Sequence, residues 1–423
     1  MTTPSPSGSA VDHSGPAAYD ARPALAIVAD APTPYRLAFH VRLARELAPL
    51  RLVSYFTHPE SNAPWALNLP PEIGPVRLCE QRDTHEAGFR NQIHQFRRAG
   101  RILRDFKAAP PAAVIINGYN DLGRLRVLSW CKRHRIPAFI WGDSNLFSDR
   151  TGGIKRLLKQ AVVRYAVHRS EGVMVCGRLG HAFFQHYAGR SVPTFIVPYE
   201  PDYTLFASPP PERRTHIAAR YGLTMPRRRL IYSGRLAPEK RVDLLIDAFH
   251  RIAARRPQWD LLLVGDGPLR SALEQRVRPD LAERVRFLGF QNDAADVAAI
   301  YHHGDALCLP SEFEPWAVVI SEAAAAGLAL VASHVVGAAP ELVHDGINGR
   351  TFFSNDLDDL TDALLDVTHP DRIDRYRAAS PRVLEGWHQR CDPVLGVRKA
   401  LASVGRAEPA HAATAAPAPS ASP

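Results

Sequence analysis

The 423-residue chain has few cysteines, no long apolar run and a polar start. Its five cysteines are scattered, with no CxxC pair and no histidines at metal-ligand spacing, which argues against a zinc site and a disulfide framework. No stretch reaches the ~18 apolar residues of a membrane span. The first residues, MTTPSPSGSAVDHSGP, are too polar for a signal peptide. Together these absences predict a cytoplasmic protein.

Two common phosphate-binding motifs are also missing. No GxxxxGK[ST] loop is present, and no GxGxxG opens a strand–helix unit. Because those loops wrap phosphates with backbone N–H groups, their absence argues against P-loop nucleotide hydrolysis and classical dinucleotide binding.

Basic residues outnumber acidic ones, giving a formal charge of +9 and a pI near 9.5. Such a balance favours anionic partners, namely nucleic acid, phosphate-bearing small molecules or an acidic membrane surface. A generally Arg-rich solvated surface is the simpler alternative. We expect no nucleic-acid partner, because neither a basic recognition helix nor an aromatic stacking ribbon is recognisable.

Short apolar runs alternate with stretches of helical periodicity along most of the chain. Runs that are almost wholly apolar are typical of parallel strands covered by helices on both faces. The pattern predicts an α/β protein with two parallel sheets and helices between the strands, for example at 35–47 and 154–169. The expected strands are 24–29, 51–56, 112–117, 137–141, 172–176 and 194–198, then 228–234, 260–265, 285–290, 305–310 and 328–333.

Length and composition predict two domains between low-complexity ends, because one hydrophobic core rarely serves so long a chain. Ligands of open parallel sheets bind beyond the carboxyl ends of the strands, so we expect the site in the cleft between the domains. The expected divisions are a disordered tail (1–22), an N-terminal domain (23–198), a linker with a PPP triplet (199–227), a C-terminal domain (228–380), a terminal helix (381–405) and a second disordered tail (406–423).

Two cations follow the expected strand 228–234. Arg235 lies at the end of the strand and Lys240 at the start of the next helix. Cationic side chains beside a positive helix N-terminus suit a di-anionic phosphate group. Two solvated cations in a loop are the simpler alternative. The next loop, GDGPLR (265–270), has glycines that allow either close approach to a ligand or a tight turn.

The stretch SEFEPWAVVISEAAAAGL (311–328) follows another expected strand and holds two carboxylates. Pro315 suits the first helical position, which gives Glu314 an N-cap-like place, and Gly327 can end the helix. On one helix, Glu322 would lie about 80° round from Glu314, so both can face a cleft. The alternative is a cap and a surface charge. Against it, the apolar run after Glu322 makes an unpartnered carboxylate costly.

Four blocks occur in order along the second half of the chain: GRLAPEKR (234–241), LLLVGDGPLR (261–270), VRFLGF (285–290) and PSEFEPWAVVISEAAAAGLALVAS (310–333), followed by GAAPELVHDGINGRTF (337–352). Together they resemble the retaining glycosyltransferases of family 4, which have the GT-B fold. The N-terminal half is more loosely similar, through ADAPTPYRLAFHVRLAREL (29–47). The resemblance implies two Rossmann-like domains facing across a cleft, with the terminal helix crossing back to the first domain.

The resemblance also implies a nucleotide-diphosphate sugar donor held by the C-terminal domain. Arg235 and Lys240 would neutralise the diphosphate, Glu322 would hold the ribose diol, and Glu314 would face the donor sugar. The implied donor-binding residues are Gly234, Phe290, Pro315, Trp316, Ala317, Val318 and Glu322. The implied catalytic residues are Asp143, Arg235, Lys240 and Glu314.

Retaining transfer through an oxocarbenium-like state makes stabilisation of the departing diphosphate the main electrostatic task. We expect no metal and no cofactor besides the donor, because the two cations can do this and no DxD-type loop follows a strand. Two departures from the family pattern stand out. Ala317 replaces a glycine that many members have, which bears on donor choice. The loop GDSNLFSDR (142–150) lacks the histidine of many members; Asp143 would replace it, or would only cap a turn.

The expected acceptor is a sugar or a lipid-linked sugar, bound by N-terminal loops near Trp65, His85 and Arg90, in polysaccharide or glycolipid assembly. The basic charge favours peripheral contact with the anionic inner face of a membrane. Two alternatives remain open. One is a nucleotide-sugar epimerase of the same fold, and the other is a catalytically silent scaffold that binds sugar nucleotides.

Overall fold

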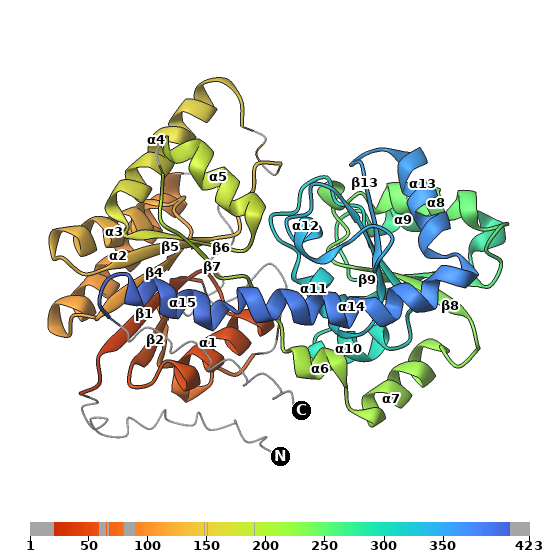
Figure 1. The fold of residues 1–423 in the computed structure, drawn as a ribbon, viewed down its shortest axis with the longest axis horizontal. Coiled ribbons are helices and arrows are strands. Elements are labelled where there is room, and N and C mark those ends of the chain that lie inside the picture. The colour runs from red at the N-terminus through yellow and green to blue at the C-terminus, as the bar shows by residue number, and fades with distance from the viewer. Residues whose placement is uncertain are drawn as a thin grey trace, which may run out of the picture.

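The computed structural model describes residues 21–58, 65, 67–79, 89–147, 149, 151–189 and 191–406. Most of both expected tails, and His85, lie outside the described residues. The chain forms two α/β domains side by side, the first at the left of Figure 1 and the second at the right. No described helix is both long and apolar enough to cross a bilayer.

The N-terminal domain is built on a seven-stranded parallel sheet in the order β3-β2-β1-β4-β5-β6-β7. Its strands are β1 (Ala24–Ala29), β2 (Arg51–Phe56), β3 (Pro75–Arg77), β4 (Ala113–Asn117), β5 (Ala138–Gly142), β6 (Gly172–Val175) and β7 (Thr194–Ile196). Along β1, Leu25 and Ile27 belong to one core, and Ala26 and Val28 belong to another. Both faces of the sheet are therefore buried, as the apolar runs predicted.

Helices cover the two faces of this sheet. They are α1 (Pro34–Glu46), α2 (Phe89–Ala108), α3 (Leu122–Arg133), α4 (Gly153–Arg169) and α5 (Arg178–Ala188). Helices α2 to α5 pack in sequence, each against the next, and α1 lies on the opposite face. The N-termini of α3, α4 and α5 thus follow the carboxyl ends of β4, β5 and β6 directly.

The C-terminal domain has a six-stranded parallel sheet in the order β10-β9-β8-β11-β12-β13. Its strands are β8 (Arg228–Ser233), β9 (Trp259–Val264), β10 (Val285–Gly289), β11 (Ala306–Leu309), β12 (Ala329–Ser333) and β13 (Gly349–Phe352). Its helices are α8 (Val242–Ile252), α9 (Arg270–Arg276), α10 (Ala294–Tyr301), α11 (Val318–Ala325), α12 (Ala339–Leu342) and α13 (Leu357–Val367). The short turns η1 (Pro71–Ile73), η2 (Pro238–Lys240) and η3 (Pro279–Leu281) complete the two domains.

Two segments connect the domains. The stretch 199–227 carries α6 (Tyr203–Ala207) and α7 (Pro211–Tyr221), which pack against α10 and α11. At the other end, α14 (Pro370–Cys391) packs on α11 and β12, and α15 (Pro393–Ala402) packs on β7 and α1. The blue helices of Figure 1 therefore run from the second domain back to the first. The predicted α/β architecture, including this return, is confirmed.

Candidate functional site

The loop after β8 carries the two cations expected at the site. Arg235 is exposed, and no ion pair or hydrogen bond engages its guanidinium in the described part of the chain. Lys240 ends the turn η2, and the left-handed Arg241 (φ 51°) then starts α8. The loop thus presents one unpaired cation and a second one close to the helix entrance.

Lys240 is joined to the loop after β11 by an ion pair. Its Nζ lies 2.6 Å from Oε2 of Glu314, and both side chains are mostly buried. Ser311 also donates a hydroxyl hydrogen bond to this carboxylate, at 3.4 Å. The structure therefore brings together two of the residues predicted from separate motifs, and here Glu314 neutralises Lys240.

The expected start of the next helix was wrong. Helix α11 begins at Val318 rather than at Pro315, and its N-cap residue is Ala317 in a left-handed conformation (φ 80°, ψ 79°). The backbone before it pairs with the β12–α12 loop: Gly337 N donates to Glu314 O at 3.0 Å, and Ala338 N donates to Trp316 O at 2.8 Å. Because this pairing diverts the chain, Glu314 is neither an N-cap nor on the same helix as Glu322.

Around Ala317, the Trp316 side chain packs in the interior, whereas several backbone N–H groups lack an acceptor among the described residues. Trp316 is buried, and its indole N–H donates to Tyr199 O at 3.3 Å, across the domain junction. None of the described hydrogen bonds uses the N–H groups of Trp316, Ala317 or Val318. These donors at the start of α11 are suited to an anionic or hydroxyl-bearing ligand. Gly327 has φ 74° just past the helix, as expected for a C-terminal glycine.

Glu322 is a half-buried residue of α11 and not a fully exposed surface charge. Burial raises its pKa to about 7, against a smaller opposing effect from the Tyr301 hydroxyl, which donates to Oε2 at 3.4 Å. A single long hydrogen bond leaves most of its acceptor capacity unused. The Glu322 carboxyl can therefore accept further hydrogen bonds from hydroxyl groups of a ligand.

The glycines of the GDGPLR loop serve packing. A Cβ on Gly265 (φ 128°) would lie 1.9 Å from Gly234 O, and one on Gly267 would lie 2.4 Å from Leu236 O. The close approach that these glycines permit is therefore to the backbone of the loop after β8. Gly234 and its neighbours are held in place by this contact.

Asp143 lies at the carboxyl end of β5, facing the second domain. Burial raises the pKa of its carboxyl above the usual range; Glu314 raises it further, and Arg36 acts in the opposite direction. Arg36 is itself buried near the start of α1 and donates to Asn117 Oδ1 at 3.4 Å. Glu314 of the second domain therefore lies close enough to Asp143 to act electrostatically on its carboxyl.

Asn145, two residues further along, bridges the domains. Its Nδ2 donates to Glu314 O at 3.1 Å and to Pro315 O at 3.0 Å. At the start of α5, Arg178 forms a second bridge: its backbone N–H donates to Glu341 Oε1 at 2.8 Å, and its Nε does so at 3.1 Å. The Asn145 contacts hold the β5–α4 loop against the backbone that precedes α11, and the Arg178 contacts join α5 to α12.

Phe290 follows β10, at the edge of the same face. Its ring meets that of Trp65 edge-on, with centroids 5.2 Å apart. Phe290, predicted to bind the donor, and one residue of the expected acceptor region are therefore in contact across the domains. Arg90 lies on α2, and His85 is outside the described residues.

Among the described residues, one group of three side chains is close enough to hold a metal ion: Glu200, His388 and Asp392, whose ligand-type atoms lie within 4.8 Å of one another. Arg42 already occupies it, with Nη1 2.7 Å from Glu200 and Nη2 on Asp392. The group lies where α14, α15 and α1 meet and is best described as an ion-pair cluster. The expectation of no metal at the site stays a prediction.

Sequence reasoning missed Asn145, Arg36 and Arg178. Each acts through contacts with distant segments, and the Asn145 partners are backbone atoms of the other domain. The only local signal was the position of Asn145 in a polar loop just after a strand. The roles assigned to the predicted site residues stay predictions, although Lys240, Glu314 and Asp143 do converge.

Known structures show the same architecture. Sucrose-phosphate synthase from Thermosynechococcus elongatus superposes with a TM-score of 0.72 at 16% identity, covering 90% of this chain and 99% of that one. Anabaena Alr3699/HepE in complex with UDP gives 0.67 at 19% identity with the same coverage. At these identities the likeness concerns the fold, and that fold is GT-B.

Sequence relatives identify the family. The family model described as glycosyl transferases group 1 matches residues 227–369. The GDP-mannose-dependent α-(1-6)-phosphatidylinositol monomannoside mannosyltransferase of Mycolicibacterium smegmatis is 32% identical over 319 residues, 72% of this chain and 76% of that protein. Glycogen synthase of Mycobacterium tuberculosis is 35% identical over 154 residues, and the chain spans only 37% of that protein. The chain belongs to the glycosyl transferases group 1 family.

Proposed function

We propose that this protein is a retaining glycosyltransferase of family 4 that moves a sugar from a nucleotide-diphosphate sugar to an acceptor hydroxyl. The observation that carries the proposal is the Lys240–Glu314 ion pair, which joins two loops at the carboxyl ends of parallel strands. Arg235 lies in the same loop as Lys240 and has no ion-pair partner among the described residues. A structural relative that binds UDP and UDP-glucose, and a sequence relative that depends on GDP-mannose, support it.

Donor binding would exchange partners at this site. A diphosphate brings more negative charge than one carboxylate, so it would draw Lys240 away from Glu314 and engage Arg235 as well. Glu314 would then be available to a hydroxyl of the donor sugar. Glu322, with spare acceptor capacity, would take the two ribose hydroxyls, and binding them would favour its ionised form.

The reaction would break the bond between the sugar C1 and the phosphate oxygen, leaving the electron pair on the nucleoside diphosphate. The acceptor oxygen would form the new bond to C1 on the same face, and its proton would pass to an oxygen of the departing phosphate. Arg235 and Lys240 would stabilise the negative charge that develops there without a metal ion. Asp143 would provide a polar group beside the sugar, where burial raises the pKa of its carboxyl.

We propose a lipid-linked or oligosaccharide acceptor in glycolipid or polysaccharide assembly. The M. smegmatis relative named above acts on a phosphatidylinositol mannoside, which supports the lipid-linked form. Trp65, which touches Phe290, would close one side of the space between donor and acceptor.

Thermal unfolding with excess UDP, GDP, ADP or TDP tests the donor site. One nucleotide should raise the midpoint, since a ligand at about 100 times its dissociation constant adds about 2.7 kcal/mol. The double variant Arg235→Ala/Lys240→Ala should lose the shift, whereas Arg255→Ala/Arg382→Ala, two exposed cations elsewhere, should keep it. If no nucleotide shifts the wild type, the silent-scaffold alternative also loses its ligand.

Turnover with the matching nucleotide sugar then tests the chemistry. We expect transfer with the donor's anomeric configuration in the product, read by NMR, and activity that persists in EDTA. An inverted product or loss of activity in EDTA would refute retention or metal independence respectively. Nucleotide binding with neither transfer nor donor hydrolysis would favour the scaffold, and conversion of the free nucleotide sugar would favour an epimerase.

A further inference from the structure

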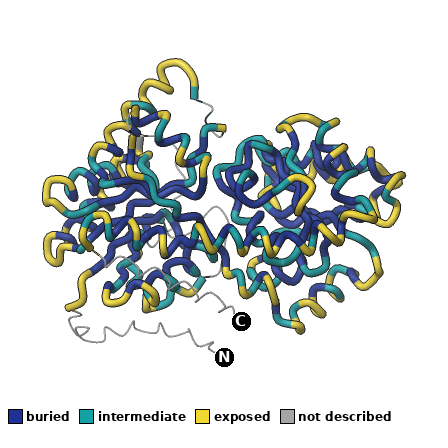
Figure 2. Tube along the Cα trace, viewed as in Figure 1, coloured by how far each residue is buried: buried dark blue, intermediate teal, exposed yellow. Residues whose placement is uncertain are grey.

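The outer layer of the N-terminal domain carries an apolar surface that no part of the described chain covers. In α4, Ile154 is 76% exposed, Leu157 65% and Leu158 63%. Figure 2 shows these first turns as an exposed arch at the top of the first domain. Isolated exposed aliphatics are ordinary, but three within five residues form a patch that favours contact with another apolar phase.

The patch continues along α4 toward α3. Ile154, Leu158, Ala161 and Tyr165 follow one another at helical spacing and form one stripe. Tyr165 is 40% exposed, and its hydroxyl lies 2.8 Å from the Ser129 hydroxyl on α3. The stripe therefore ends at the surface between α3 and α4.

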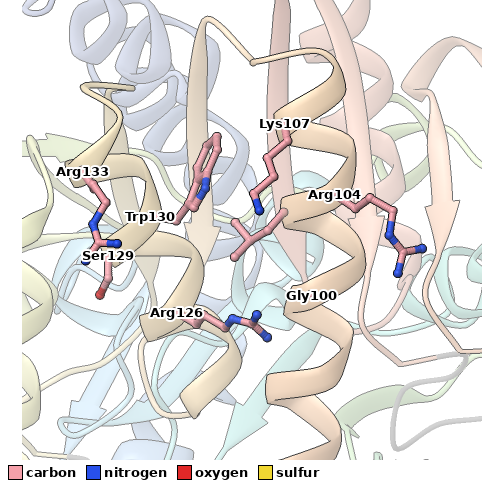
Figure 3. A pocket seen from close by; sticks show the side chains of 8 residues that line it. Gly100, Arg104, Lys107, Arg126, Ser129, Trp130 and Arg133 are labelled. Carbon is pink, nitrogen blue, oxygen red and sulfur yellow. The ribbon is translucent and has the colours of Figure 1, made fainter.

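At that point the surface becomes basic. A pocket of about 440 Å³ between α2 and α3 has a lining that includes Arg104, Lys107, Arg126, Ser129 and Arg133. Of the described residues that line it, none carries a carboxylate. Figure 3 shows Lys107 and Arg126 extending into the space between the two helices. A shallower neighbouring pocket, between α3 and α4, adds Lys132 and Arg169.

The pocket between α2 and α3 is suited to an anion. Arg126 is held in place, because its Nη1 donates to Phe96 O at 2.7 Å and its guanidinium lies over the Phe96 ring at 4.1 Å. Trp130 contributes a buried indole N–H that has no acceptor among the described residues. Arg104, Lys107 and Arg133 likewise have no ion pair in the part of the chain that the structure describes. A phosphate group in this space would pair with Lys107 and Arg126, and the neighbouring cations would add to the attraction (Figure 3).

We propose that α4 and the α2–α3 pocket dock this protein on an anionic phospholipid bilayer. The aliphatic side chains would enter the headgroup–acyl boundary, and a lipid phosphate would occupy the pocket. Nucleic acid would match the charge but would leave the aliphatic patch in water. A second copy of α4 is disfavoured because Gly153–Arg169 contains Lys and Arg but no acidic residue.

The proposed membrane-binding surface lies close in sequence to the candidate site. Helix α4 follows the β5–α4 loop, which holds Asp143 and Asn145 against the second domain. A bilayer touching the first turns of α4 would lie at the entrance of the cleft. A lipid-linked acceptor could then reach the site without leaving the membrane. This role in acceptor delivery rests on the proposed function, whereas the proposed binding to the bilayer does not.

Vesicle co-sedimentation of the full chain, without donor, tests the docking. We expect binding to phosphatidylcholine vesicles with 30% phosphatidylglycerol, and little to pure phosphatidylcholine. The triple variant Ile154→Ser/Leu157→Ser/Leu158→Ser should bind at least tenfold more weakly. Lys107→Ala/Arg133→Ala should also lose about tenfold, mostly at low salt. Met225→Ser/Ile347→Ser/Phe353→Ser, which changes exposed apolar residues of the connecting segment and the second domain, should bind normally.

Three outcomes would overturn the proposal. These are equal binding to both kinds of vesicle, a triple variant that binds as well as wild type, and full displacement by millimolar inorganic phosphate, which would indicate a small-anion site. A duplex oligonucleotide that competes fully, with the triple variant unaffected, would indicate nucleic acid instead. The nucleotide-dependent thermal shift, measured on the same variants, should stay intact, so failure of docking is distinguishable from failure of the donor site.

Discussion

A single methyl group sits in an unfavourable backbone conformation at the entrance of α11. Ala317 has φ 80°, a region in which glycine is at ease and other residues are strained by about 1–3 kcal/mol. The surrounding contacts impose this angle, because Gly337 and Ala338 hold the backbone of residues 314 and 316 from the β12–α12 loop. The strain explains in physical terms why glycine suits this position.

Ala317→Gly should therefore stabilise the protein. We expect the free energy of unfolding to rise by about 1 kcal/mol, the relief of strain less the added entropy of glycine in the unfolded chain. Urea unfolding followed by circular dichroism measures it. The matched control is Ala325→Gly, in the last turn of α11 with ordinary helical geometry, which should lose up to about 1 kcal/mol. Equal losses in both variants would contradict the strain argument.

Glu322 predicts a pH-dependent stability difference. Burial raises its pKa to about 7 from an ordinary value of 4.5, so its contribution to stability is fully present below pH 4.5 and is lost as the pH rises through 7. Glutamine does not ionise, so the Glu322→Gln variant does not lose this stability as the pH rises. The free energy of unfolding of Glu322→Gln minus that of wild type should increase by about 3 kcal/mol between pH 4.5 and pH 8.

Denaturant unfolding across that pH range, without ligand, measures the difference. Glu283→Gln, on the exposed surface, should show a nearly flat difference. A difference for Glu322→Gln that does not vary with pH would mean that the carboxylate ionises in the folded protein as freely as in water.

At the scale of elements, most strands could be predicted and two could not. A buried parallel strand is apolar at nearly every position, so runs such as 24–29 and 112–117 can be recognised in the sequence. β3 (PVR) and β13 (GRTF) are edge strands of three and four residues with polar side chains, and nothing in their local composition distinguishes them from loops. They form because the backbone N–H and C=O groups of the neighbouring strands β2 and β12 hydrogen-bond to them.

The start of α11 illustrates a second limit. Pro315 is a sound local signal for a first helical position, yet the segment around it hydrogen-bonds to residues 337 and 338, which are distant in sequence. The cations and carboxylates of the site were recognisable because each follows a strand. The Lys240–Glu314 contact and the bridging role of Asn145 depend on how two loops and two domains meet, and no local pattern contains that information.

At the scale of the whole molecule, one ion-pair cluster joins the returning C-terminal helices to the first domain. His388 on α14 lies 3.2 Å from Asp392 and 3.3 Å from Glu200, and its ring meets that of Tyr203 at 5.4 Å. Arg42 on α1 contacts both carboxylates and lies 3.5 Å from the imidazole. Hydrogen bonds to Asp392 and then Glu200 raise the pKa of His388 to about 9.

This cluster should make the attachment of α14 and α15 depend on pH. Because the folded-state pKa of His388 exceeds its ordinary value of 6.5, its stabilisation is fully present below pH 6.5 and is lost as the pH rises through 9. His388→Gln should cost about 1–2 kcal/mol at pH 6, after allowance for partial exposure, and much less at pH 10. His216→Gln, on the exposed face of α7, should cost little at either pH. If His388→Gln cost as much at pH 10 as at pH 6, the imidazole would contribute by packing alone. Arg42 would then supply the positive charge that pairs with Glu200 and Asp392.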